Sequence, residues 1–149
     1  MNDWCFLSAR QLSEAIDRGD LDAERLTERF LDRIAVTDAS INSYVLLLAE
    51  SARAEARAAA ARAQRKQRLS PIDGIPVALK DNIDVAGVPT SNGFGGEPYR
   101  VPHEDAELVR RLRAAGAVIL GKLNMHEGAI GALTNNPHFG RTKIGRAHV

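Results

Sequence analysis

A change in composition at Ser70 and Pro71 constrains the fold of this chain more than any other feature. Residues 50–68 are rich in Ala, Arg, Glu and Gln and contain no Gly or Pro, which predicts a long helix. From residue 70 onward, Pro, Gly and β-branched residues replace these helix formers. We therefore expect helices in the first half of the chain and a unit that contains strands in the second half.

Two shorter helices are expected before the long one. Ser8 followed three places later by Gln11 forms a capping-box pattern, and Gly19 is expected to end the helix that it starts. A second helix is predicted from about Asp20. Each has apolar residues spaced for one face, which are Leu12 and Ile16 in the first helix and Leu26, Phe30 and Ile34 in the second. The apolar run at residues 44–49 fits either a strand or the first turn of the long helix.

The second half predicts the order strand, loop, helix, strand. Residues 75–79 and 117–120 are short apolar runs that favour buried strands. Residues 81–101 hold too many Gly and Pro residues for regular structure, which predicts a long shaped loop. The helix between loop and second strand is expected to be capped by Asp105, to end at Gly116, and to turn Leu108, Val109 and Leu112 to the core. A further helix over residues 124–133 is possible, and the whole order favours an α/β sheet.

Composition narrows the class of protein. With 149 residues and 44% hydrophobic content, the chain fits one globular domain. The formal net charge of +1 gives no electrostatic reason to expect a nucleic acid or a membrane surface as a partner. The sequence has neither a membrane-spanning apolar stretch nor a signal-peptide layout, and Cys5 is its single cysteine, which excludes an internal disulfide. We therefore expect a cytoplasmic protein.

Two partial motifs do not match their full patterns. Residues 116–122 spell G-x-x-x-x-G-K, but Leu123 replaces the Ser or Thr of a phosphate-binding loop, and the middle residues are strand-like. His126 and Glu127 begin the zinc pattern H-E-x-x-H, but Ile130 is no second ligand. We therefore expect neither a cofactor nor a metal.

Lys80 is the residue for which the sequence most clearly indicates a catalytic role. It comes directly after residues 74–79 at the end of the predicted strand. If the side chains of this strand are alternately or fully buried, the ammonium group of Lys80 would lie in the interior. Burial of a lysine is costly unless the charge is paired or the amine is neutral, and a neutral amine can act as a general base. The structural alternative is that Lys80 pairs with Asp81 or Asp84 at the strand end.

Five sequence segments, taken in their order and spacing, then indicate a family. They read GIPVALKDN at 74–82, GVPTS at 87–91, AAGAVILGK at 114–122, NMHE at 124–127 and NPHFG at 136–140. In this order and spacing the chain resembles the N-terminal part of an amidase signature enzyme, from about Leu7 to Thr142 and most strongly from Ser70.

The resemblance implies an incomplete α/β fold, in which a mixed β-sheet is flanked by helices and two to three helices open the chain. It also implies an amidase that hydrolyses a carbon–nitrogen amide bond with a Ser, cis-Ser, Lys triad, in which Lys80 matches the catalytic lysine. The neutral amine would take a proton from the bridging serine, which activates the nucleophilic serine. Met125, His126 and Glu127 fall where the wall of the substrate pocket would be.

The chain also departs from the family pattern. Leu123 stands where relatives usually have Thr, and no serine follows Ser91, so both triad serines would lie beyond this chain. Residues 143–149 resemble translated adapter sequence, which leaves 1–142 as the amidase part. On this interpretation the chain is a fragment that is inactive by itself, folds partially and dissolves poorly, because the missing part would cover its apolar faces and strand edges.

Two other interpretations stay open. Within the family, the parent could be the glutamine-hydrolysing component of a tRNA-dependent amidotransferase, which needs partner subunits. From another class, the chain could be a small binding module whose Gly-rich loop, residues 87–96, holds a ligand. The expected partner of the parent amidase is a small-molecule amide, with a homodimer as a candidate assembly.

Overall fold

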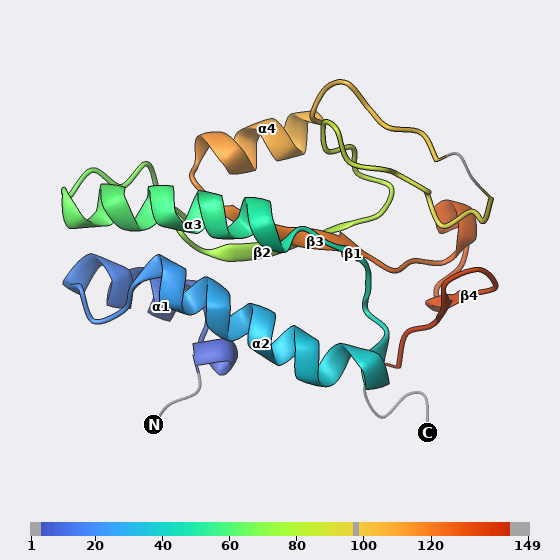
Figure 1. The fold of residues 1–149 in the computed structure, drawn as a ribbon, viewed down its shortest axis with the longest axis horizontal. Coiled ribbons are helices and arrows are strands. Elements are labelled where there is room, and N and C mark those ends of the chain that lie inside the picture. The colour runs from blue at the N-terminus through green and yellow to red at the C-terminus, as the bar shows by residue number, and fades with distance from the viewer. Residues whose placement is uncertain (1–3, 97–98, 144–149) are drawn as a thin grey trace.

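The computed structural model describes residues 4–96 and 99–143, which form helices packed on a small mixed sheet (Figure 1). The elements in chain order are η1 (Trp4–Phe6), α1 (Ala9–Arg18), α2 (Ala23–Ile41), β1 (Tyr44–Leu47), α3 (Ala49–Gln64), β2 (Pro76–Lys80), α4 (Glu107–Ala114), β3 (Val118–Leu123), η2 (Glu127–Ala129), β4 (Asn135–Asn136) and β5 (Gly140–Arg141). The first half is mostly helical, as expected, but the open segment 44–49 contains strand β1, which belongs to the same sheet as the strands of the second half. The adapter-like residues 144–149 lie outside the described residues, whereas the Lys143 N–H donates to the Ile41 carbonyl at 2.8 Å.

The start of α1 follows the local sequence signals. The Gln11 N–H donates to Ser8 Oγ, and the Ser8 N–H donates to Gln11 Oε1 at 2.9 Å, so the capping box is confirmed. Gly19 ends the helix in the left-handed conformation with φ of +77°. The next helix, α2, begins later than predicted, because the carboxylate of Asp22 accepts from the backbone N–H groups of Glu24 and Arg25.

The main sheet has three strands in the order β1-β3-β2, with β1 antiparallel and β2 parallel to β3. The mixed sheet expected from the resemblance is therefore present. The register between β2 and β3 shifts once, because Val77 pairs with Ile119 and the next residue, Ala78, pairs with Gly121. This bulge at Leu120 reverses the alternation of faces along β3 relative to β2.

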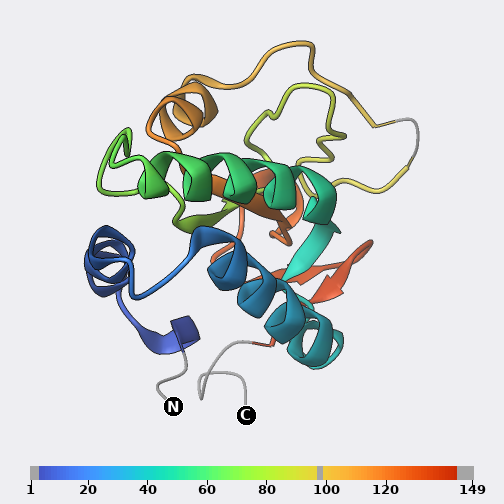
Figure 2. The same ribbon diagram turned by 60° about the vertical axis from the view of Figure 1, so that its left-hand side comes forward.

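Helices and the long loop cover the two faces of the sheet. On one face, Leu31 of α2 and the alanines Ala52 and Ala56 of α3 pack against Val118 and Leu120. Figures 1 and 2 show α2 and α3 side by side over the sheet. The other face buries a second apolar cluster that includes strand, loop and α4 residues, namely Leu79, Val85, Val109 and Ile119. The loop between β2 and α4 extends to the end of the molecule that is distant from α1 (Figure 1).

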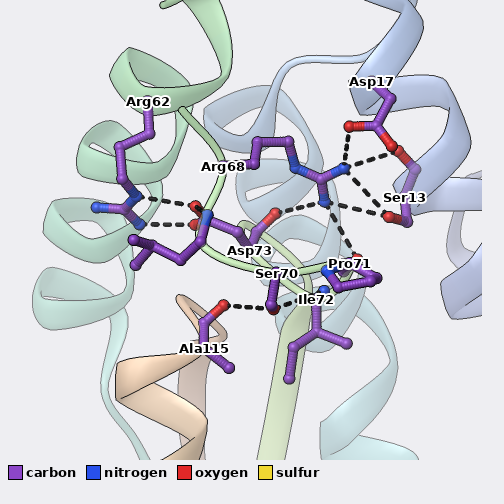
Figure 3. Close-up of polar contacts among 10 residues, drawn as sticks. Ser13, Asp17, Arg62, Arg68, Ser70, Pro71, Ile72, Asp73 and Ala115 are labelled. Atoms are coloured by element: carbon purple, nitrogen blue, oxygen red, sulfur yellow. Dashed lines mark hydrogen bonds and ion pairs between the residues drawn. The ribbon is translucent and has the colours of Figure 1, made fainter. Parts of the chain in front are cut away.

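A polar cluster joins the two halves of the chain just before β2 (Figure 3). The buried carboxylate of Asp73 accepts two hydrogen bonds from Arg62 of α3, with N–O distances of 2.6 and 2.8 Å. Arg68 donates to the Asp73 carbonyl at 2.9 Å and to Ser13 of α1 at 3.2 Å. Ser70 donates to the Ala115 carbonyl at the end of α4 at 2.7 Å. The segment before β2 is thus bound to α1, α3 and α4 together.

Three predictions in the second half are wrong. Asp105 does not cap α4 but accepts from the Ala86 N–H at 2.7 Å, and Leu108 is 49% exposed. Residues 124–133 contain only η2, with Gly128 at φ of +59° inside it. Ala129 also has a positive φ, of +60°, so two successive residues in the left-handed conformation prevent a helix from running through this segment.

Among the described residues, no helix has the length and apolar character needed to cross a membrane.

Candidate active site

Lys80 is the last residue of β2, and its side chain is exposed. The expectation that its ammonium group is buried within this chain is therefore wrong. Successive strand residues point to opposite faces, and the buried neighbours Leu79 and Asp81 occupy the covered face. Lys80 consequently points to the opposite face, where at the end of β2 its side chain is left exposed.

The two suggested partners of Lys80 are occupied by other cations. The carboxylate of Asp81 binds the ammonium group of Lys122, and that of Asp84 binds the guanidinium group of Arg100. The hydrogen bond from Arg100 holds the pKa of Asp84 below its usual value. The structural alternative, an ion pair at the strand end, is thus wrong for Lys80.

A cavity of about 330 Å³ lies beside Lys80. Besides this lysine, it is lined by residues 123–126 and 131–134. Met125 and His126, two residues predicted to form the pocket wall, therefore lie around the same cavity as Lys80. The His126 Nδ1 contacts the Leu133 carbonyl oxygen at 2.7 Å, and since a carbonyl only accepts, this contact requires a proton on Nδ1. Leu123, the residue that departs from the family pattern, forms an apolar part of the wall.

Glu127, the third predicted wall residue, lies outside the lining of this cavity. Its Oε1 contacts Nε2 of His138 at 3.0 Å, and both side chains are partly exposed. A β-carbon on Gly95 would come within 2.2 Å of the His138 ring, so this glycine allows the histidine to pack against the long loop. Glu127 thus belongs to a contact between η2, the loop and the β4–β5 turn.

Sequence reasoning missed the lysine that is buried. Lys122 of β3 is 0% exposed, and its Nζ lies 2.9 Å from Asp81 Oδ1 and 3.1 Å from Thr90 Oγ1. The sequence did contain an indication of this position. Apolar residues stand on both sides of the Gly121-Lys122 pair, so Lys122 is expected within the strand and not after its end. The bulge at Leu120 then brings Lys122 beside Leu79 on the face covered by the loop.

The last serine of the sequence is engaged away from Lys80. Ser91 donates from Oγ to Asp81 Oδ2 on the covered face of the sheet. Within the described residues, no group of three or more His, Cys, Asp or Glu side chains could hold a metal ion. The arrangement around Lys80 is an amine in the lining of a cavity with both polar and apolar walls, which is suited to proton transfer once water is excluded.

Comparisons with known proteins agree with the motifs. The family model described as Amidase matches residues 25–146. The chain is 42% identical over 138 residues to a glutamyl-tRNA(Gln) amidotransferase subunit of Moorella thermoacetica, a match that covers 93% of this chain and 28% of that protein.

Solved structures show the same relationship. A chain from the vestigial protein complex that reveals the evolutionary origins of an s-triazine catabolic enzyme matches with a TM-score of 0.86 and 40% identity over 92% of this chain and 30% of its own. The native peptide amidase of Stenotrophomonas maltophilia matches with a TM-score of 0.83 and 33% identity over 94% of this chain and 30% of its own. The chain spans about three tenths of the length of the relatives that it matches. It belongs to the amidase signature family.

Proposed function

We propose that this chain is the N-terminal portion of an enzyme that hydrolyses a carbon–nitrogen amide bond, with Lys80 as its general base. The observation that carries the proposal is the position of Lys80, which ends β2 beside a cavity shared with Met125 and His126. Because the chain spans about three tenths of its relatives, the remaining parts of the site would come from the rest of a longer protein.

The proposed mechanism uses Lys80 in its neutral form. Its amine takes a proton from a bridging serine, which in turn takes the proton of the nucleophilic serine as that serine attacks the amide carbonyl. Backbone N–H groups of a Gly/Ser-rich loop stabilise the oxyanion, and the proton held by Lys80 passes back through the bridging serine to the leaving nitrogen as the C–N bond breaks. Water, which loses a proton to the same relay, then releases the acid from the acyl-enzyme and regenerates the nucleophilic serine. In this chain the amine is exposed. The longer protein would have to cover the exposed end of β2 and so keep the amine uncharged.

The test is activity of a full-length protein that carries this chain. We expect Lys80→Ala to lower kcat about a thousandfold or more towards small amides, since the general base and the positioned amine are lost together. Lys80→Arg keeps the positive charge but cannot take the proton, so it should be about as impaired.

The matched control is Lys66→Asn. Lys66 is an exposed lysine in the left-handed conformation, with φ of +56°, which asparagine tolerates. This variant should keep kcat within about twofold of the wild type. Full activity in Lys80→Ala would show that the proposed chemistry is wrong.

A second candidate is favoured by the names of two relatives. Proteins at 42% and 43% identity, from Moorella thermoacetica and Anaeromyxobacter sp., are each named as a glutamyl-tRNA(Gln) amidotransferase subunit. On this candidate the longer protein would hydrolyse glutamine and pass the ammonia on within a complex of subunits. Glutamine hydrolysis that appears only with partner subunits would support it, and turnover of simple amides by the single chain would favour a free-standing amidase.

The remaining expectations concern the setting of the reaction. We propose a cytoplasmic enzyme that takes a small-molecule amide and requires no metal or organic cofactor, because the lysine and two serines suffice for the proposed proton transfers. A homodimer is the assembly that we propose to test first, by sedimentation of the full-length protein.

A further inference from the structure

A buried ion pair joins β2 and β3 directly beside Lys80. The ammonium group of Lys122 lies 2.9 Å from Asp81 Oδ1, and the exposed fractions of the two side chains are 0% and 3%. The Lys122 Nζ also donates to Thr90 Oγ1 at 3.1 Å. Lys122 is therefore bound to the residue that follows Lys80 and to the first part of the long loop.

Asp81 uses all of its polar groups in this cluster. Its second carboxylate oxygen, Oδ2, accepts from the backbone N–H of Ser91 at 3.1 Å and from the Ser91 hydroxyl. Its own N–H donates to the Leu123 carbonyl at 3.1 Å, and its carbonyl accepts from the Asn92 N–H at 3.3 Å. The backbone immediately after Lys80 is thus held by β3 on one side and by the loop on the other.

The same network reaches the far wall of the cavity. The Gly93 N–H donates to Ser91 Oγ at 3.0 Å, and the Gly93 carbonyl accepts from Asn136 Nδ2 at 2.8 Å. The same Nδ2 donates to the Met125 carbonyl at 2.9 Å. A continuous series of hydrogen bonds therefore runs from Asp81 to the backbone of Met125, which lines the cavity together with Lys80.

Stability alone is a weak reason for such a pair. Two buried charges lose their hydration, and apolar residues of similar volume often serve a fold as well or better. What an ion pair with satisfied hydrogen bonds adds is a defined geometry, because each partner tolerates few arrangements. Here the geometry that it defines is the end of β2.

We propose that Asp81 and Lys122 are positioning residues, which fix the direction of Lys80 and its separation from the Met125 wall. This inference rests on the proposed role of Lys80 as general base. Neither residue points to the reacting atoms, since Asp81 is buried under the loop while Lys80 is exposed on the opposite face of the sheet. They act on the reaction only through the placement of Lys80 and of the cavity wall.

The experiment compares variants of the full-length protein. We expect Lys122→Met and Asp81→Asn each to lower kcat about tenfold or more while KM changes by less than about threefold, because a displaced base affects the chemical step more than substrate binding. The double variant should be no worse than the more impaired single variant, since the two residues act as one unit.

Thr90 offers a milder pair of variants, because Val has nearly the volume of Thr without the hydroxyl, and Ser keeps the hydroxyl but lacks the methyl group. Thr90→Val removes the hydroxyl that accepts from Lys122, and we expect kcat to fall by about threefold to tenfold. Thr90→Ser keeps the hydroxyl and should restore kcat to within about twofold of the wild type. These variants decide the question even if Lys122→Met fails to fold.

The matched control is Asp73→Asn, which alters another buried, ion-paired carboxylate that has no part in the network around Lys80. It should lower the melting temperature and leave kcat within about twofold of the wild type. Hydrogen exchange of peptides covering residues 88–96 and 124–136 should accelerate in Lys122→Met and Asp81→Asn, but not in Asp73→Asn.

Several outcomes would overturn the proposal. The first is a wild-type kcat in folded Asp81→Asn and Thr90→Val. The second is that Asp73→Asn loses as much kcat as these variants when its melting temperature falls by the same amount. Unchanged hydrogen exchange in both peptides would also contradict it. If instead Lys80→Ala is fully active, the proposed function fails, while the exchange data still decide whether the pair holds the loop and the wall.

Discussion

At the residue scale, Glu55 shows how a single side chain supports the sheet where its register shifts. Its Oε2 accepts from the Ile119 N–H at 2.8 Å, beside the bulge in β3, and its Oε1 binds Arg113 of α4. Burial raises the pKa of Glu55, and the bonds from Ile119 and Arg113 offset part of this rise. The carboxyl group therefore connects α3, β3 and α4 while its ionisation is disfavoured.

This environment predicts a pH dependence. A pKa that is higher in the folded state favours folding at low pH, and this contribution is lost as the pH rises from about 4 through the folded-state value. Glu55→Gln keeps an oxygen that can accept from Ile119 but does not titrate. We therefore expect the melting temperature of the wild-type full-length protein, relative to this variant, to fall as the pH rises above about 4.

Glu28 supplies a control of opposite sign. Its hydrogen bond with Arg53 holds the pKa of Glu28 below its usual value, so ionisation favours folding. Relative to Glu28→Gln, the wild type should gain a small amount of stability as the pH rises to about 5, small because solvent screens this partly exposed pair. If the stability difference between wild type and variant changed with pH in the same direction for Glu55→Gln and Glu28→Gln, burial would not be the dominant cause of the pKa shift at Glu55.

At the scale of the element, local signals explain the start of each opening helix. The capping box of Ser8 and Gln11 begins α1, and the carboxylate of Asp22 begins α2 by binding two backbone N–H groups. By contrast, α4 begins at Glu107 after Ala106, which offers no side-chain cap, because the expected residue, Asp105, binds the loop and Arg113. Tertiary contacts can thus take a capping residue away from its own helix.

For α2, we predict that Asp22→Ala weakens the first turn by about 1 kcal/mol. That loss corresponds to about fivefold faster hydrogen exchange at the N–H groups of residues 24–26, measured in the full-length protein. The control is Asp20→Ala, which removes only an exposed ion pair with Arg18 and should leave these rates nearly unchanged. Equal exchange in both variants would show that packing and not the cap holds the first turn.

At the scale of the whole molecule, the helical half and the strand-containing half form one unit with an open side. The cluster of Arg62, Arg68 and Asp73 binds the halves together (Figure 3). The sheet, however, leaves β2 at an edge, and large apolar side chains near the cavity are exposed, with Ile130 at 89%. An unpaired strand edge and exposed apolar surface both favour association with other chains.

We therefore predict that the 149-residue chain by itself associates. In sedimentation velocity it should form oligomers at about 10–100 μM, the range in which exposed strand edges promote aggregation. A full-length protein under the same conditions should not show this heterogeneous association, because its additional residues would cover the open side. A homogeneous monomer of the short chain with a cooperative, reversible melt would contradict the prediction.

Sequence alone determined the features that depend on near neighbours in the chain. The cap of α1, the apolar spacing of α2 and the long loop after β2 follow from side-chain chemistry and backbone preference over a few residues. The family also followed from sequence, since its segments keep their order and spacing. These properties require no knowledge of which strands lie side by side.

Only the tertiary structure decided which lysine is buried. Lys80 is the last residue of β2 and Lys122 is the penultimate residue of β3. The residues around Lys122 indicate that it lies within a strand, but they do not show what covers its side chain. The bulge at Leu120 and the pairing of Leu79 with Lys122 place Lys122 under the loop, while Lys80 is exposed on the opposite face at the end of β2. Burial depends on strand register and on what covers each face, and both are set by contacts between residues that are distant in the chain.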